Sequence, residues 1–377
     1  MRFAAPRFLA PVLLFLLNGS AELTAEPGVR AAPTRPGAVQ PAPSNSAPAK
    51  PLPAAPRAAA PKAGPRRQAA EATISLETVA KQLGMKLWAD QTGREARLSD
   101  SARRMEFEAD SREAKVDGLR LFLGDPMTIR DGAFHISRTD FEVCVRPLLR
   151  PALIPSRPPD PKVIAIDAGH GGNDTGTENP RLGLQEKVFT LDVARRLKKL
   201  LEARGYKVVM TRDADQKVDL AERSVIANRA GADLFVSIHF NSLYPDTKTT
   251  GAEVFTFTRA GQRSDQSRGF GQPDDTEDAA VPVNRFDAWS VVLAQALHRE
   301  TLAALKLPDR GHKTKHLGVL RGLKCPAALV ESGFLSNDLE AKKISTPAYR
   351  QEIAAALASG IESYASIVRV IRAKPRP

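Results

Sequence analysis

The chain has 377 residues, 42% of them hydrophobic, which is enough for more than one domain with a full globular core. Its net charge of +12 lies to a large extent in the first 70 residues; this favours an anionic polymer or surface as partner, and not nucleic acid, since no aromatic residues interleave with the basic ones. Only two cysteines occur, Cys144 and Cys325, which excludes a disulfide scaffold, and we expect both to be buried and reduced.

Residues 1–25 are typical of an export signal. Basic residues precede the apolar run Phe8–Leu17, which is too short to span a bilayer, and small residues suited to cleavage follow up to Ala25. We therefore expect a periplasmic protein with no stable membrane insertion after cleavage. An uncleaved membrane anchor is the alternative.

A linker is predicted over residues 26–72. This segment is rich in proline, alanine and arginine, so it cannot bury enough apolar surface to fold by itself. We expect a disordered, extended spacer between the export signal and the folded part of the chain.

Residues 73–150 are predicted to form a small α+β module. The apolar spacing from Leu76 to Leu83 predicts a helix, with Ser75 as its N-cap and Gly84 as its end. Short strand-like pieces separated by turns follow at 85–88, 104–108, 113–116, 119–123, 128–129 and 133–136. Residues 151–161 are predicted to be a second, shorter linker.

Strands and helices alternate over residues 162–370. Strands are expected at 162–166, 207–210, 234–238, 253–257 and 327–330, and helices at 186–204, 220–230, 291–305 and 347–367. This alternation predicts an α/β fold with a largely parallel twisted sheet flanked by helices. A polar insertion at 259–287 interrupts the pattern.

Three residues of this region are candidate metal ligands. His170 follows a buried strand within a glycine-rich turn, His239 comes at the end of another strand, and Glu186 opens a helix. Two imidazoles and a carboxylate, with a position left for water, form a catalytic zinc site. The alternatives are a turn histidine, a core histidine, and a carboxylate that stabilises the helix N-terminus.

Glu331 is a candidate catalytic carboxylate. It comes at the end of an apolar strand, where an ionised carboxylate is costly unless it is paired or functional. A carboxylate beside an activated water can take its proton and deliver it to a leaving amine. The alternative is an ion pair with Arg321.

The segments Asp167–Gly176, Ser237–Ser242 and Leu329–Asn337, together with Glu186, resemble the zinc-dependent N-acetylmuramoyl-L-alanine amidases of bacterial cell walls. The resemblance implies a single Zn²⁺ held by the three candidate ligands, with Glu331 as the catalytic carboxylate. It also implies Asn241 and Arg321 as substrate-binding residues.

The resemblance implies a hydrolase that acts on linear amides. The bond cleaved joins N-acetylmuramic acid to L-alanine in peptidoglycan, which is the expected partner, and an activator protein is a further candidate partner. Another exported zinc peptidase or deacetylase, or a non-catalytic cell-wall-binding protein, remains the alternative.

Two further segments carry expectations. Residues 73–150 contain a helix that ends at Leu83-Gly84, the turn Val116-Asp117-Gly118 and the run Gly132–Ser137. In these features they resemble the stalk-like N-terminal domain of copper amine oxidases. The resemblance implies no copper site, and we expect His135 to be an ordinary strand residue. The insertion at 259–287 is expected to be either a lid, with Asp275 or Glu277 approaching the metal, or a surface loop.

Overall fold

The computed structural model of the protein describes residues 73–259, 262, 264–265 and 284–374. The predicted export signal, the proline-rich linker and most of the insertion, including Asp275 and Glu277, lie outside the described residues.

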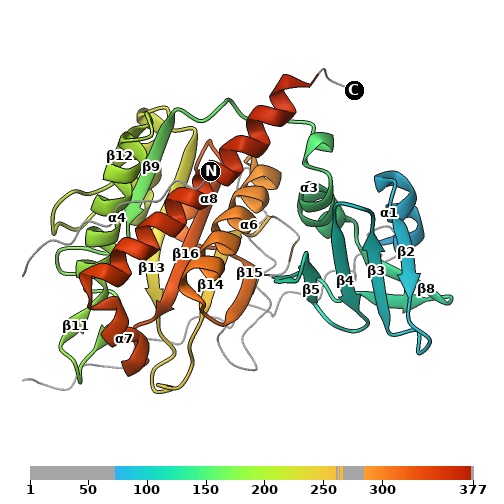
Figure 1. The fold of residues 1–377 in the computed structure, drawn as a ribbon, viewed down its shortest axis with the longest axis horizontal. Helices are drawn as coiled ribbons and strands as arrows, with labels where there is room; N and C mark the ends of the chain where they lie inside the picture. Colours follow the sequence, from blue (N-terminus) through green and yellow to red (C-terminus); the bar gives the residue numbers. More distant parts are fainter. Residues whose placement is uncertain (1–72, 260–261, 263, 266–283, 375–377) are drawn as a thin grey trace, which may run out of the picture. The chain divides into compact units, whose positions relative to one another are not determined.

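The C-terminal part of the chain is built on a twisted mixed sheet (Figure 1). Its strands, in spatial order, are β12 (Lys207–Met210), β9 (Val163–Ala168), β13 (Leu234–Asn241), β16 (Ala327–Phe334), β14 (Ala252–Phe257) and β15 (Asp309–Lys315). All neighbouring strands are parallel except β14 and β16. The predicted α/β fold with a largely parallel sheet is confirmed.

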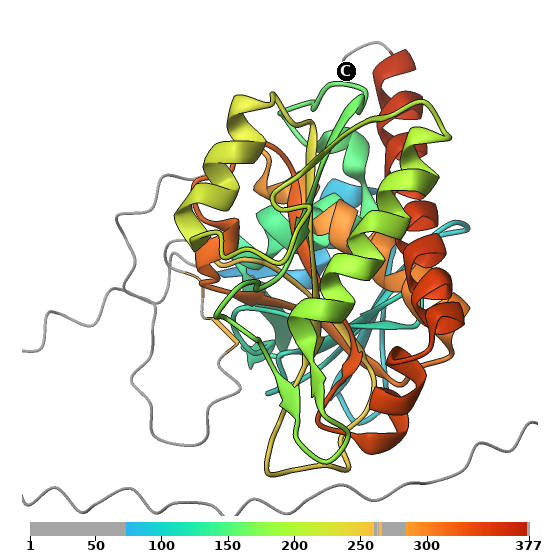
Figure 2. The same ribbon diagram turned by 90° about the vertical axis from the view of Figure 1, so that its left-hand side faces the viewer.

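Helices cover both faces of this sheet (Figure 2). One face packs against α4 (Glu186–Glu202), α6 (Asp287–Leu305) and α8 (Pro347–Ala373), and the other packs against α5 (Leu220–Arg229) and the short helix η3 (Gly318–Leu320). Successive strand residues point to opposite faces, so the strands supply two separate apolar cores and are buried on both sides.

Several short elements of this region are absent from the sequence expectations, among them α7 (Asp338–Ile344) and β15. Helix α7 is short and capped by Asn337, whose side chain accepts from two backbone N–H groups. Strand β15 has the sequence DRGHKTK, which carries no apolar run that would mark it as a strand.

Helix α8 is, among the described residues, the one helix long and apolar enough to cross a membrane. More than half of its most apolar window is buried within the protein. It packs along α4 and α6, and its buried face includes Leu357, Ile361 and Tyr364. This burial is that of a core helix.

Residues 73–153 form a second region with its own apolar core. Helix α1 (Leu76–Leu83) begins at the N-cap Ser75 and ends at Gly84, as expected. The strands are β1 (Thr73–Ser75), β2 (Lys86–Ala89), β3 (Glu95–Ser99), β4 (Arg104–Glu108), β5 (Glu113–Val116), β6 (Leu119–Phe122), β7 (Thr128–Arg130) and β8 (Ala133–Ser137).

Strands β1 and β3 and the helical run that follows β8 were not predicted from the sequence. This run consists of α2 (Arg138–Asp140), the π-helical η1 (Phe141–Val145), α3 (Arg146–Leu149) and η2 (Pro151–Leu153). Its apolar side chains belong to the core of this region, and Cys144 is among them. Both cysteines are buried and free, which confirms that expectation.

The two regions share one continuous sheet. Strand β15 pairs with β6, so that β6, β5, β4, β3 and β2 extend the order to eleven strands. Val291 of α6 packs into the core of the N-terminal region. The segment between the regions is held by two hydrogen bonds. The Trp289 indole N–H donates to the Ser156 carbonyl, and the Arg372 guanidinium donates to the Pro158 carbonyl.

His312 of β15 lies at this junction and is fully buried. Its Nε2 lies 3.0 Å from Thr256 Oγ1. Burial lowers the pKa of this imidazole to about 3, and nearby His298 contributes in the same direction. His312 is therefore neutral in the folded protein, whereas in the unfolded chain it gains a proton below its ordinary pKa of 6.5.

We predict that this difference destabilises the protein in acid. Since the unfolded chain binds the proton and the folded chain does not, stability is present above about pH 6.5 and falls by about 1.4 kcal/mol per pH unit below it. Urea unfolding of wild type and His312→Gln between pH 5 and 7 tests this. Below pH 6.5, the free energy of unfolding should fall less steeply with pH in the variant than in wild type, whatever the variant's stability at pH 7. The same pH dependence in both proteins would show that His312 is not responsible.

Candidate metal centre

His170 lies just beyond the end of β9 with its backbone in the left-handed region, at φ 63°. Few residues other than glycine adopt this conformation, which persists only where the surroundings enforce it. Here Arg223 donates from Nη2 to the His170 carbonyl over 2.9 Å. The loop that carries the imidazole is therefore held by hydrogen bonds from a neighbouring helix.

Two buried arginines hold the rest of this loop. Arg212 donates to the carbonyls of Ala168 and Gly169, each over 2.8 Å. Arg223 also pairs at 2.8 Å with Asp167, whose carboxylate accepts further hydrogen bonds from two hydroxyl groups. A buried charge is costly unless it is paired and hydrogen-bonded, and this network meets that condition.

Glu186 is the first residue of α4, with a side chain that is only 2% exposed. The hairpin formed by β10 (Glu178–Asn179) and β11 (Leu184–Gln185) leads into the helix. The carboxylate accepts a backbone hydrogen bond from Thr177 at 2.8 Å and another from Phe240 at 3.0 Å. These two bonds fix its orientation toward the histidines.

His239 lies within β13, two residues before the strand ends, and not at the terminus expected from the sequence. A shift in the pairing of β13 with β16 directly after His239 accompanies this extension. Its ring packs edge-on against that of His170, with centroids 4.8 Å apart. Gly169 permits this approach, since a Cβ atom there would lie 2.3 Å from the His239 ring.

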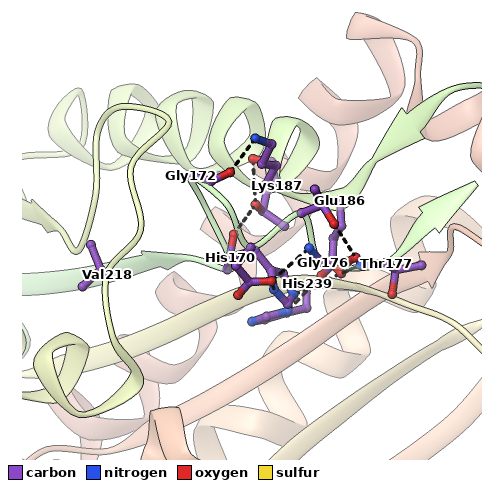
Figure 3. A network of polar contacts seen from close by, with 12 residues as sticks. His170, Gly172, Gly176, Thr177, Glu186, Lys187, Val218 and His239 are labelled. Carbon is purple, nitrogen blue, oxygen red and sulfur yellow. Dashed lines mark hydrogen bonds and ion pairs between the residues drawn. The ribbon is translucent and has the colours of Figure 1, made fainter. Parts of the chain in front are cut away.

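The three side chains meet at one point (Figure 3). His170 Nε2 lies 3.1 Å from Glu186 Oε2, and His239 Nδ1 lies 2.9 Å from Glu186 Oε1. One ligand atom from each residue falls within 4.8 Å of the others. The structure thus brings together the three residues singled out from the sequence as candidate ligands.

The electrostatics of the cluster favour a bound cation. Burial raises the pKa of the Glu186 carboxyl, but hydrogen bonds from His170 and His239 outweigh this and hold that pKa below its ordinary value. Burial lowers the pKa of His170, whereas Glu186 and Asp174 outweigh burial and raise it. The ionised carboxylate thus attracts positive charge, which a proton or a metal ion can supply.

The donor set suits a divalent transition metal. Two imidazoles and one carboxylate are the ligands of catalytic zinc sites. His170 Nδ1 is 2.9 Å from Asp174 Oδ1, and Asp174 in turn accepts the backbone N–H of Gly176. A carboxylate that orients a ligand histidine in this way is a usual companion of such metal sites.

Glu331 lies inside β16, directly opposite His239 in the parallel pairing. Within the described part of the chain, its Oε2 atom is buried without a hydrogen-bond partner. Burial raises the pKa of this carboxyl well above its ordinary value, and the carboxylates of Glu186 and Glu253 raise it further, while Lys315 opposes them. The Glu331 carboxyl group therefore holds a proton more strongly than an ordinary glutamate does.

A cavity of about 380 Å³ opens beside the histidines. Its lining includes His170, His239, Asp174, Lys217, Leu220 and Val319. Cavities of this size accommodate small-molecule groups. A small molecule can therefore reach His170 and His239 from the face of the sheet that α5 covers.

Asn241 and Arg321, which were predicted to bind substrate, make different kinds of contact within the protein. The Asn241 amide donates to the Glu253 carboxylate, and its Oδ1 accepts from Ser242 N at 2.7 Å. The Arg321 guanidinium lies 6.0 Å from the centre of the Phe257 ring. His135, expected to be an ordinary strand residue, lies in β8 with Nδ1 3.1 Å from the Ala133 carbonyl.

The sequence analysis did not identify the residues that hold His170, Glu186, His239 and Glu331 in place. They are Asp174, Arg212, Arg223, Glu253 and Lys313. For Glu253 the available signal was a charged residue inside an apolar strand, which requires a buried partner. Arg212 and Arg223 gave no such signal, because arginine is ordinary in helices and loops.

A family model described as N-acetylmuramoyl-L-alanine amidase matches residues 164–363. The sporulation-specific N-acetylmuramoyl-L-alanine amidase of Bacillus subtilis is 34% identical over 201 residues, covering 53% of this chain and 66% of that protein. N-acetylmuramoyl-L-alanine amidase AmiA of Escherichia coli K12 is 30% identical over 221 residues, covering 54% of this chain and 76% of AmiA.

Among solved structures, an N-acetylmuramoyl-L-alanine amidase from Clostridium difficile 630 is 30% identical. The match covers 54% of this chain and 97% of the Clostridium difficile chain, with a TM-score of 0.46. The chain thus spans slightly less than two thirds of the Bacillus subtilis relative and about three quarters of AmiA.

We predict that Gly176→Ala disrupts metal binding. A Cβ atom at Gly176 would lie 2.6 Å from both Glu186 Oε2 and the His170 ring. The variant should bind zinc at least roughly tenfold more weakly, as measured by competition with a chromogenic chelator.

Gly183→Ala is the matched control for this variant. Gly183 has a similar φ of +64°, but a Cβ atom there meets nothing within 4 Å. Both variants should lose about 1 kcal/mol of stability through backbone strain, whereas the control should keep wild-type zinc affinity. Equal zinc affinities in the two variants would contradict the prediction.

Proposed function

Because the chain belongs to the N-acetylmuramoyl-L-alanine amidase family, we propose that it hydrolyses the amide between N-acetylmuramic acid and L-alanine in peptidoglycan. The observation that carries this proposal is the meeting of His170, Glu186 and His239 beside the buried, unpaired Oε2 of Glu331 among the described residues. The family match spans all four of these residues.

The metal proposed for this site is a single Zn²⁺, held by His170, Glu186 and His239. Zinc at such a site polarises a carbonyl group and lowers the pKa of water. Asp174 orients the His170 ring, and the arginines that hold the strand-end loop keep the ring in place. The donors are thus arranged before any ion arrives, which limits the entropy that binding must overcome.

Glu331 is the proposed proton carrier. Its raised pKa and its unpaired oxygen allow it to accept a proton from the attacking water at Oε2. The same carboxyl group then delivers the proton to the leaving amine of L-alanine. Asn241 and Arg321 remain proposed contacts to the substrate.

The proposed setting is the periplasm, with peptidoglycan as substrate and an activator protein as a further partner. The basic N-terminal sequence and the export-like residues 1–25 support this setting. The resemblance of residues 73–150 to a stalk-like domain is part of the same proposal. A zinc peptidase or deacetylase would share the metal chemistry, so identification of the reaction products has to separate these activities.

The test is digestion of purified peptidoglycan sacculi by the full chain, with products identified by mass spectrometry. Intact stem peptides with a free N-terminal L-alanine should appear with zinc and be absent with a chelator. Cleavage within the stem peptide, or release of acetate, would instead indicate the peptidase or the deacetylase. Binding to sacculi without any product would indicate the non-catalytic alternative.

We predict that Glu331→Gln lowers kcat for stem-peptide release by about 10²–10⁴-fold, because the amide cannot accept the proton. Zinc content, measured by atomic absorption, should remain that of wild type. Glu352→Gln, at an exposed position of α8, is the matched control and should keep wild-type kcat. A Glu331→Gln enzyme with wild-type kcat would remove Glu331 from the mechanism.

A further inference from the structure

A row of charged side chains continues from the catalytic carboxylate across the sheet. Glu253 of β14 lies directly opposite Glu331 in the antiparallel pairing of β14 with β16. Residues opposite each other in a sheet project from the same face, so both carboxylates are on the face of the cluster. The proposed activity assigns no role to Glu253.

Glu253 is deeply buried, with a side chain only 5% exposed, and two cations pair with it: Lys313, and Arg310 with its Nε 3.5 Å from Glu253 Oε2. The Lys313 ammonium donates to its Oε2 over 2.6 Å, and the Asn241 amide donates to its Oε1. A buried carboxylate held by a buried cation has a fixed position. Glu253 thus fixes the end of β13 directly after the metal-ligand candidate His239.

Lys313 connects this site to the N-terminal region. Its ammonium lies 3.7 Å from Asp265, and Asp265 lies 3.9 Å from Arg112, which follows β4. Asp265 is held against β15 by a 2.7 Å hydrogen bond from its backbone N–H to the Thr314 carbonyl. A chain of four alternating charges therefore runs from the N-terminal region to the neighbour of the catalytic carboxylate.

A second contact holds the same segment. The Gln262 amide is buried and donates to Asp140 of α2 over 3.0 Å. Asp140 also accepts the backbone N–H groups of Gly124 and Asp125. The described residues 262 and 264–265 are therefore held between the N-terminal region and β15.

We propose that Glu253 is a positioning residue for Glu331 and Asn241, and that Arg112 supports it from the N-terminal region through Asp265 and Lys313. This inference rests on the proposed amidase activity. Residues 73–150 then act as part of the catalytic apparatus, in addition to any role as a stalk.

The experiment is a double-mutant cycle in the full, zinc-loaded chain, with kcat and KM measured for stem-peptide release. Glu253→Gln keeps the shape of the side chain and removes its charge, so kcat should fall by about 10–100-fold, with a smaller rise in KM because Asn241 is a proposed substrate contact. Arg112→Gln should lower kcat by about two- to fivefold, as expected for a partly exposed ion pair.

The double variant distinguishes coupling from independent damage. If the four charges act as a chain, Arg112→Gln has no further effect once Glu253 is neutral, and the double variant has the kcat of Glu253→Gln alone. Multiplication of the two effects would overturn the inference. Arg104→Gln, which removes an exposed arginine paired with Glu106 in the same region, is the matched control and should keep wild-type kcat.

Two measurements separate positioning from general damage. Zinc affinity should be that of wild type in every variant; loss of zinc from Glu253→Gln would overturn the positioning role. If Glu253→Gln does not fold, Glu253→Gln with Lys313→Met removes both members of the closest buried ion pair, which is tolerated better than leaving one of them unpaired. Wild-type kcat in that folded variant would also overturn the inference.

The inference and the proposed function fail in different ways. A wild-type chain that releases no stem peptide removes the amidase activity, and the positioning role falls with it. A wild-type chain that is active, together with a Glu253→Gln variant of equal kcat, leaves the amidase activity in place and overturns only the inference.

Discussion

The candidate metal centre depends on the hydrogen bonds that Arg212 and Arg223 donate to the backbone at the end of β9. At the end of β9, the carbonyls of residues 168–170 accept hydrogen bonds from arginine side chains. Arg212 and Arg223 supply these donors, while Asp167 balances part of their charge. These donors help to hold His170 in its left-handed conformation.

Close approach is the second constraint on this centre. Glu186 can contact two imidazoles because Gly169 and Gly176 leave the space that any larger side chain would occupy. The close packing of the cluster therefore explains the composition of the segment Asp167–Gly176. Its glycines provide room for the cluster, its histidine belongs to the cluster, and Asp174 orients that histidine.

The sequence predicted most of the C-terminal region, because buried strands and amphipathic helices leave distinct apolar patterns. It failed for β15, whose polar side chains are paired within the protein and give no apolar run. The cluster could be predicted because its residues follow apolar strands or open a helix. The buried cation that pairs with Glu253 could not be predicted, since Lys313 is 60 residues away in the sequence, on a strand with no apolar run.

The shared sheet also has a consequence for how the protein tolerates cutting. Strand β15 pairs with β14 along most of its length on one side, and with β6 at His312 and Leu121 on the other. A fragment that lacks the N-terminal region would uncover one edge of β15 together with the apolar side chain of Val291. Open edges of this kind recruit other chains, so we expect the isolated C-terminal region to self-associate where the intact chain stays dispersed.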